Sequence, residues 1–126
     1  MIENDLHPIR KVVLAGLDKQ NAEFDYEMIE LANLAEANYM EVVGTVTQKL
    51  ERPNAATYFG KGKVEELKEA VEYYEADMVV TNDELSPSQI RNLESGTGAG
   101  IMDRTALILD IFASRAKTRV AKLQVA

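Results

Sequence analysis

The chain has 126 residues, 46% of them apolar and 28% charged, which suits one domain with a hydrophobic core. Its net charge is −7 and it has no cysteine, which excludes disulfides, thiolate metal sites and thiol catalysis. It has neither an apolar stretch of about 18 residues nor the layout of a signal peptide, so we expect a cytoplasmic protein with no membrane partner.

The first half of the chain predicts a strand, a helix and a second strand. Lys11–Leu17 is a nearly continuous apolar run, typical of a buried central strand in a parallel sheet. A helix is expected from about Asp25, its predicted N-cap, and it has one apolar face. That face comprises Phe24, Met28, Leu31, Ala32 and Ala35. Tyr39–Leu50 then alternates with a period of two. Met40, Val42, Gly44 and Val46 are expected on one side of this strand, and Glu41, Val43, Thr45 and Thr47 on the other.

The middle of the chain predicts a loop, two further helices and a short strand between them. Pro53–Gly62 is expected to be a loop, and the helix after it has an apolar face made by Val64, Leu67, Val71 and Tyr74. Asp77–Asn82 predicts another buried strand. Ser86, Pro87 and Gln89 then form the pattern of a capping box that opens a third helix.

The last part of the chain predicts a short strand at Ile101 and Met102, followed by one long helix that runs to the last residue. Asp103 is its predicted N-cap and Arg104 is expected to be exposed. Its apolar stripe comprises Leu109, Phe112, Ala116, Val120 and Leu123. We expect this stripe to be incompletely buried, because its partner would be a further helix, and a chain that ends inside an amphipathic helix suggests a fragment of a longer protein.

Strands that alternate with helices place the chain in the α/β class, with a mostly parallel sheet flanked by helices. We divide it into an α/β subdomain at 1–102 and the start of a long helical linker at 103–126.

Charge is segregated along the chain. Residues 1–48 and 64–84 carry −6 and −7, whereas residues 49–63 and 85–126 each carry +3. The acidic overall balance therefore hides two basic segments, which favour either an anion-binding face or simple complementation of helix dipoles.

Two motifs suggest where a ligand would bind. The sequence Gly60-Lys-Gly-Lys63 is not a P-loop, because Val64 stands where that motif needs Ser or Thr, but glycines that open a helix can present N–H groups to an anion. The alternative is a glycine turn with solvated lysines.

The second motif, Asn82–Asn92, joins a strand end to a helix start, where open α/β sheets bind ligands. Capping and solvation explain Asp83 and Glu84 more simply than acid–base catalysis does.

Four stretches together resemble the HflX family of translation-factor-class GTPases. They are Tyr58–Leu67, Asn82–Glu94, Asp103–Ala113, and Arg115–Arg119 with Lys122–Val125; Val120 departs from the glutamate usual in that family. The resemblance implies an N-terminal domain whose long last helix begins a helical hairpin that leads to a GTPase domain absent from this chain. It also implies that this part is a binding module and not an enzyme, and that GTP and Mg²⁺ are held in the absent domain.

The same resemblance implies the large ribosomal subunit and its RNA as partners, with a role in splitting stalled or idle ribosomes. The residues it suggests for facing ribosomal RNA are Lys61, Lys63, Gln89, Arg91, Asn92, Arg104 and Arg115. Salt-dependent interaction with phosphates is the expected mechanism.

Two other functions remain open at this point. A small-molecule site, for instance one for a purine nucleotide, would require a pocket with convergent polar groups near Gly16 and Asn82. An intramolecular regulatory contact with the chain's own GTPase domain, or a dimer, would require an exposed apolar stripe on the C-terminal helix. An RNA-binding module would require an exposed basic surface instead.

Overall fold

The computed structural model describes residues 9–125, with only the helical backbone described for residues 115–125. The strands are β1 (Arg10–Asp18), β2 (Met40–Lys49), β3 (Met78–Thr81) and β4 (Gly100–Asp103). The helices are α2 (Phe24–Ala37), α3 (Lys61–Tyr74), α4 (Pro87–Thr97) and α5 (Arg104–Val125). The four strands form one parallel sheet in the order β2-β1-β3-β4. The predicted α/β class with a parallel sheet flanked by helices is confirmed.

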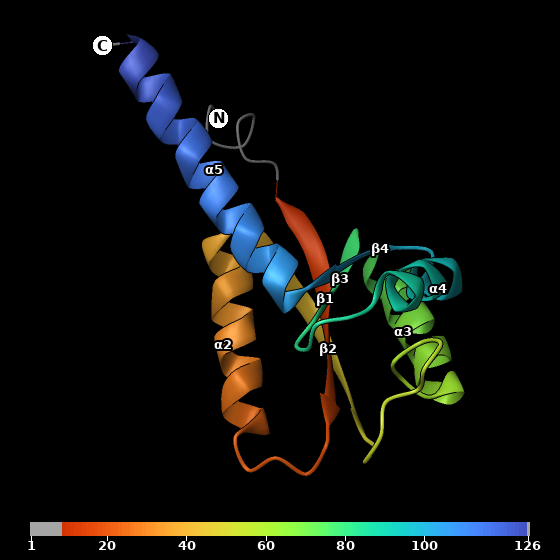
Figure 1. Ribbon diagram of the computed structural model, residues 1–126. Helices are drawn as coiled ribbons and strands as arrows, with labels where there is room; N and C mark the ends of the chain where they lie inside the picture. Colours follow the sequence, from red (N-terminus) through yellow and green to blue (C-terminus); the bar gives the residue numbers. More distant parts are fainter. Residues whose placement is uncertain (1–8, 126) are drawn as a thin grey trace.

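Helices cover both faces of this sheet (Figure 1). Helices α3 and α4 pack on one face, and α2 and the first turns of α5 pack on the other. Because all strands are parallel, their carboxyl ends lie at one edge of the sheet, and the loops that follow β1, β2 and β3 meet there.

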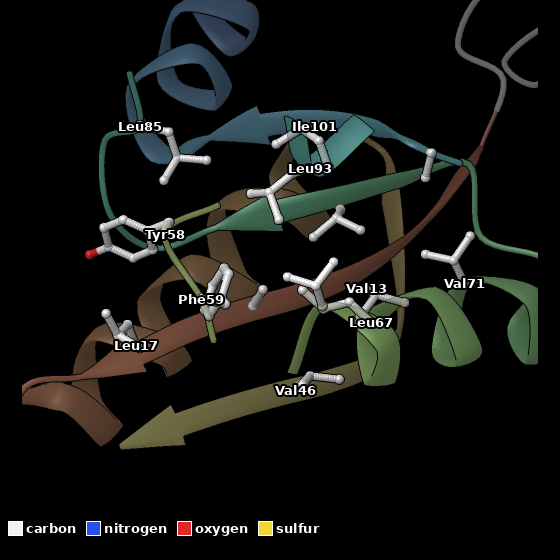
Figure 2. Close-up of a cluster of buried hydrophobic side chains, with 14 residues drawn as sticks. Val13, Leu17, Val46, Tyr58, Phe59, Leu67, Val71, Leu85, Leu93 and Ile101 are labelled. Carbon is white, nitrogen blue, oxygen red and sulfur yellow. The ribbon is translucent and has the colours of Figure 1, made fainter. Parts of the chain in front are cut away.

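The core has two halves, and β1 contributes to both. Val13, Ala15 and Leu17 face α3 and α4, in the cluster drawn in Figure 2, whereas Val12 and Leu14 face α2 and α5. All five are at most 2% exposed. Burial on both faces explains why this strand is a continuous apolar run in the sequence.

Strand β2 does not keep the strict alternation that the sequence predicts. Its register against β1 shifts by one residue, so that Val12 lies opposite Val42 but Val13 lies opposite Gly44. The extra residue, Val43, forms a bulge that reverses the facing of every later side chain. Met40 and Val42 therefore pack with α2, while Val46 packs on the α3 side. The expectation that all four even-numbered positions share one face was wrong.

The predicted helix starts are confirmed at α4 and corrected at α2 and α3. Ser86 and Gln89 form the full capping box of α4, with Pro87 at the first helical position. Helix α2 begins at Phe24, so Asp25 lies inside the first turn and is not the N-cap. The turn before α2 explains this difference, because Asn21 accepts the Glu23 N–H and so starts the helix earlier.

Helix α3 begins at Lys61, which places Gly62 in its first turn and not in the preceding loop. Gly60, in an extended conformation, is the N-cap.

Hydrogen bonds at Asp103 and Asp110 join the first turns of α5 to the rest of the domain. Asp103 caps this helix by accepting the Ala106 N–H, as predicted. Asp110, further along the same helix, accepts bonds from Arg10 and from the buried Asn38. The Asn38 hydrogen bond, followed by the Arg10 guanidinium, holds the pKa of Asp110 below its usual value against the opposing effect of partial burial.

The apolar residues of α5 divide between the core and the surface. Leu107 is fully buried, whereas Leu109 and Phe112 are 63% and 64% exposed. The predicted incomplete burial of the stripe is confirmed for these two residues. Its remaining members, Ala116, Val120 and Leu123, lie outside the residues whose side chains the structure describes. Helix α5 projects beyond the rest of the domain (Figure 1).

Candidate nucleic-acid interface

The segment between β2 and α3 forms a compact loop at the carboxyl edge of the sheet. Asn54 and Tyr58 exchange both backbone hydrogen bonds, at 3.0 and 2.8 Å. The Asn54 side chain closes the turn between them by accepting the N–H groups of Ala56 and Thr57. We call residues 54–58 the edge loop. Its side chains at Asn54, Ala55 and Ala56 are exposed, whereas Tyr58 is buried.

Helix α4 holds the edge loop through two side-chain amides. Gln89 Nε2 donates to the Asn54 carbonyl at 3.1 Å, and Asn92 Nδ2 donates to the Ala56 carbonyl at 2.8 Å. The Gln89 Oε1 atom meanwhile accepts the Ser86 N–H of the capping box. Two of the residues expected to face RNA are therefore engaged with the protein's own backbone.

Tyr58 anchors the other end of the edge loop in the core. Its ring packs edge-on against Phe59, which is 1% exposed and lies among the core side chains in Figure 2. Its hydroxyl donates to Asp83, which also pairs with Lys19 at 3.3 Å. Burial first, and then the neighbouring Asp83 carboxylate, raise the pKa of Tyr58 above its usual value, so the phenol remains a hydrogen-bond donor at neutral pH.

The first turn of α3 lies directly after this anchor. The Gly60 N–H donates to Gln48 Oε1 at 2.9 Å, and a Cβ at Gly60 would lie 2.9 Å from Gln48 Nε2, so a larger residue there would displace the end of the Gln48 side chain. Lys61 is exposed, and Lys63 pairs with Glu66 at 3.3 Å. Because the Gly60 amide is already bonded within the domain, this turn differs from a loop that cradles phosphates with successive free amides.

The start of α4 has few backbone donors left for an anion. Gln89 N–H bonds to the Ser86 hydroxyl, Ser86 N–H bonds to Gln89, and Pro87 has no N–H. The capping box itself uses the groups that an anion would need. The start of α4 is therefore closed mainly by its own capping box.

Exposed basic side chains gather at this edge of the sheet. Lys19 follows β1, Lys49 ends β2, and Arg52 lies in the loop before α3, near Lys61 in sequence. Arg91 is exposed on α4 and lies in sequence between Gln89 and Asn92, which hold the edge loop. The outer faces of α2 and α3 are by contrast strongly acidic. Lys19, Lys49 and Arg52 were not among the residues selected from the sequence, although the last two lie in a segment with an excess of positive charge.

Arg104 and Arg115 do not join this group. Arg104 is partly buried on the α2 face, where it bonds to Asn82 at 3.0 Å and pairs with Glu30 at 3.1 Å. The expectation that Arg104 is exposed was wrong, because Arg104 directly follows strand β4 and therefore lies beside the acidic helix α2. The side chain of Arg115 lies outside the described residues.

The space near Gly16 and Asn82, where the alternative of a small-molecule site would require a pocket, is filled. A Cβ at Gly16 would lie 2.6 Å from Met28 Sδ and 2.9 Å from Phe24 Cζ. Asn82 is 6% exposed, and its side chain bonds to Glu27 and to Arg104. Side chains of the domain therefore occupy the position that a nucleotide would need.

The described residues contain no group of three or more carboxylate or imidazole side chains placed to hold a metal ion. Nor does any helix within residues 9–125 have the length and apolarity needed to cross a membrane.

The fold and the edge loop together define a parallel α/β domain that carries polar, partly basic loops at the carboxyl edge of its sheet. The family described as GTP-binding GTPase N-terminal matches residues 25–113. The chain belongs to this family, as the N-terminal domain of an HflX-type GTPase.

Two relatives show how much of such a protein the chain represents. It is 51% identical over 119 residues to the GTPase HflX of Alkalihalophilus pseudofirmus, which covers 93% of this chain and 28% of that protein. It is 54% identical over 96 residues to the GTPase HflX of Caldanaerobacter subterraneus, covering 76% of this chain and 22% of that protein. The chain thus spans less than a third of these relatives.

The fold also occurs in a solved structure, a GTP-binding protein from the archaeon Sulfolobus solfataricus in complex with GDP. The match has a TM-score of 0.59 at 23% identity and covers 82% of this chain and 30% of the other. At this identity the likeness concerns the fold alone.

Proposed function

We propose that this chain is the module that binds ribosomal RNA in a cytoplasmic GTPase, one that associates with the large ribosomal subunit and splits stalled or idle ribosomes. GTP and Mg²⁺ would bind in a GTPase domain outside this chain. The observation that carries the proposal is the gathering of Lys61, Lys63, Gln89, Arg91 and Asn92 on the two helices that flank the edge loop.

The charge distribution supports this orientation. An acidic body is repelled by RNA, so a domain with basic side chains at one edge approaches RNA favourably through that edge. Lys61 and Arg91 are exposed and can reach phosphate oxygens. Lys63 is already paired with Glu66, but a surface pair of this kind is worth only about 0–1 kcal/mol and exchanges readily for a phosphate.

The test is binding of the chain to purified large ribosomal subunits across a salt series. A variant with Lys61→Ala, Lys63→Ala and Arg91→Ala is expected to bind more weakly, and its salt slope should fall by about one for each phosphate that is no longer neutralised. Lys68→Ala is the matched control, because Lys68 is exposed on the same helix α3 but lies among acidic residues. Equal affinity and equal salt dependence of the triple variant and the parent would refute the proposal.

A second candidate function is an intramolecular contact with the chain's own GTPase domain, and the exposed Leu109 and Phe112 favour it. Both side chains leave a large apolar area in water at the base of α5, which would be covered by a further element of the same protein or by a second copy. Adding the separately expressed GTPase domain should protect this face from hydrogen exchange if the contact exists. Unchanged exchange along α5 would count against it.

A further inference from the structure

We infer that Gln89, Asn92 and Tyr58 are positioning residues, which hold the edge loop in one conformation so that it docks preformed against an RNA backbone. The inference rests on the proposed function and changes the role of two residues within it. Gln89 and Asn92 would affect binding through the edge loop and not by touching RNA.

Each of these side-chain amides donates one N–H bond inside the domain. Gln89 bonds through both ends of its amide, to the Ser86 N–H and to the Asn54 carbonyl. Asn92 uses its Nδ2 donor on the Ala56 carbonyl at 2.8 Å. Each amide nitrogen has a second N–H, so these bonds fix the position of the two side chains without by themselves excluding contact with a partner.

The rest of the edge loop is closed by its own hydrogen bonds. The backbone groups of Asn54 and Tyr58 pair with each other, and the Asn54 side chain holds the N–H groups of Ala56 and Thr57. Tyr58 has a φ of +66°, a left-handed conformation that persists in a non-glycine residue only where the surroundings impose it. The bond from its hydroxyl to Asp83 and the packing on Phe59 supply that constraint.

The surface that results suits the backbone of a nucleic acid. At its tip the edge loop presents Ala55 and Ala56, whose small side chains let another chain's sugar and phosphate groups come close. Lys61 and Arg91 stand exposed on the flanking helices. Phosphate and sugar contacts fix orientation without reading sequence, so this surface fits the shape of a folded RNA and not a particular base sequence. A loop already fixed in the free protein loses little conformational freedom on binding.

Tyr58 makes the inference testable, because it is 5% exposed and cannot touch a partner directly. Tyr58→Phe removes the bond to Asp83 from inside the domain, and Asn92→Ala removes the bond to Ala56 from the surface. Gln89→Glu keeps the acceptor for the Ser86 N–H but loses the donor to Asn54. Asn33→Ala, at an exposed asparagine on α2, is the control for Asn92→Ala.

Hydrogen exchange of the free chain and binding to large ribosomal subunits are measured for each variant. All three are expected to speed exchange of the Ala56, Thr57 and Tyr58 amides by on the order of tenfold. Tyr58→Phe and Asn92→Ala should both lower affinity by roughly tenfold, and neither should change the salt slope, in contrast to Lys61→Ala. The Asn33→Ala control should match the parent in both measurements.

Two results would overturn the inference. If Asn92→Ala weakens binding while exchange of the edge loop is unchanged, Asn92 contacts the partner directly. If exchange rises in Tyr58→Phe while affinity is unchanged, the edge loop does not dock. Failure of the parent chain to bind subunits would instead refute the proposed function, and the exchange data alone would then decide whether these residues hold the loop.

Discussion

Replacing Asp103 should destabilise the domain more than any other single change at a helix start. This carboxylate is 7% exposed and has two separate partners. One oxygen accepts the Ala106 N–H and caps α5, and the other accepts the Leu85 N–H from the loop before α4. Asp103 thus joins the start of α5 to the loop before α4. The same loop contains Asp83, which accepts the hydrogen bond from Tyr58.

The expected size of the effect follows from these two bonds. Loss of an N-cap costs about 0.5–2 kcal/mol. A buried N–H left without an acceptor costs about 1–3 kcal/mol. This cost applies to the Leu85 N–H, because its hydrogen bond to Asp103 is buried. Asp103→Ala should therefore lower the free energy of unfolding by about 2–4 kcal/mol. Asp103→Asn, which keeps one acceptor oxygen, should lose about half of that.

Urea denaturation followed by circular dichroism at neutral pH measures both variants. Asp25→Ala is the control, because Asp25 is exposed in the first turn of α2 and caps nothing, so its effect should stay within about 0.5 kcal/mol. If Asp103→Ala and Asp25→Ala unfold at the same urea concentration, the double role of Asp103 is refuted.

Four further outcomes are expected. Gly16→Ala should cost about 1–3 kcal/mol of stability in urea, because its Cβ would lie 2.6 Å from Met28 Sδ; unchanged stability would show that Met28 moves aside freely. Asp110 has a lowered pKa, so its stabilising effect is present above the usual carboxyl pKa and is lost as the pH falls through the folded-state value. The stability difference between the parent and Asp110→Asn should therefore shrink as the pH falls below the usual carboxyl value of 3.8, and a constant difference would contradict this. The chain should neither bind nor hydrolyse GTP, and turnover that survives repurification and disappears in Lys63→Ala would refute this. Sedimentation should show weak self-association that Phe112→Lys abolishes, and a monomer at all concentrations would argue against pairing through α5.

Local patterns in the sequence predicted most of the fold. The apolar run at Lys11–Leu17 indicated a strand buried on both faces, and it is the strand shared by both halves of the core. The capping box at Ser86 marked the start of α4 correctly because all its bonds lie within four residues. The bulge at Val43 could not be foreseen, since it depends on how β2 aligns with β1 and not on its own alternation.

The site was less predictable because its contacts join distant parts of the chain. Gln89 and Asn92 were selected as polar residues on a helix, but their partners are 35 and 36 residues away. Gln48, which accepts the Gly60 amide, gave no local signal. The sequence predicted that Arg104 is a solvated residue at a helix start, but in the folded sheet it pairs with Glu30, which is 74 residues away.

Directed hydroxyl-radical probing of ribosomal RNA tests the central claim most directly. The chain has no cysteine, so a single Ala55→Cys variant carries an iron chelate at the tip of the edge loop alone. A Tyr73→Cys variant carries the same chelate near the opposite end of α3, at a residue that is 80% exposed. Bound to large ribosomal subunits, the probe at position 55 should cut the RNA at a few defined sites, and the probe at position 73 should cut it weakly or not at all. Strong cutting from position 73 with none from position 55 would show that another face of the domain meets the RNA.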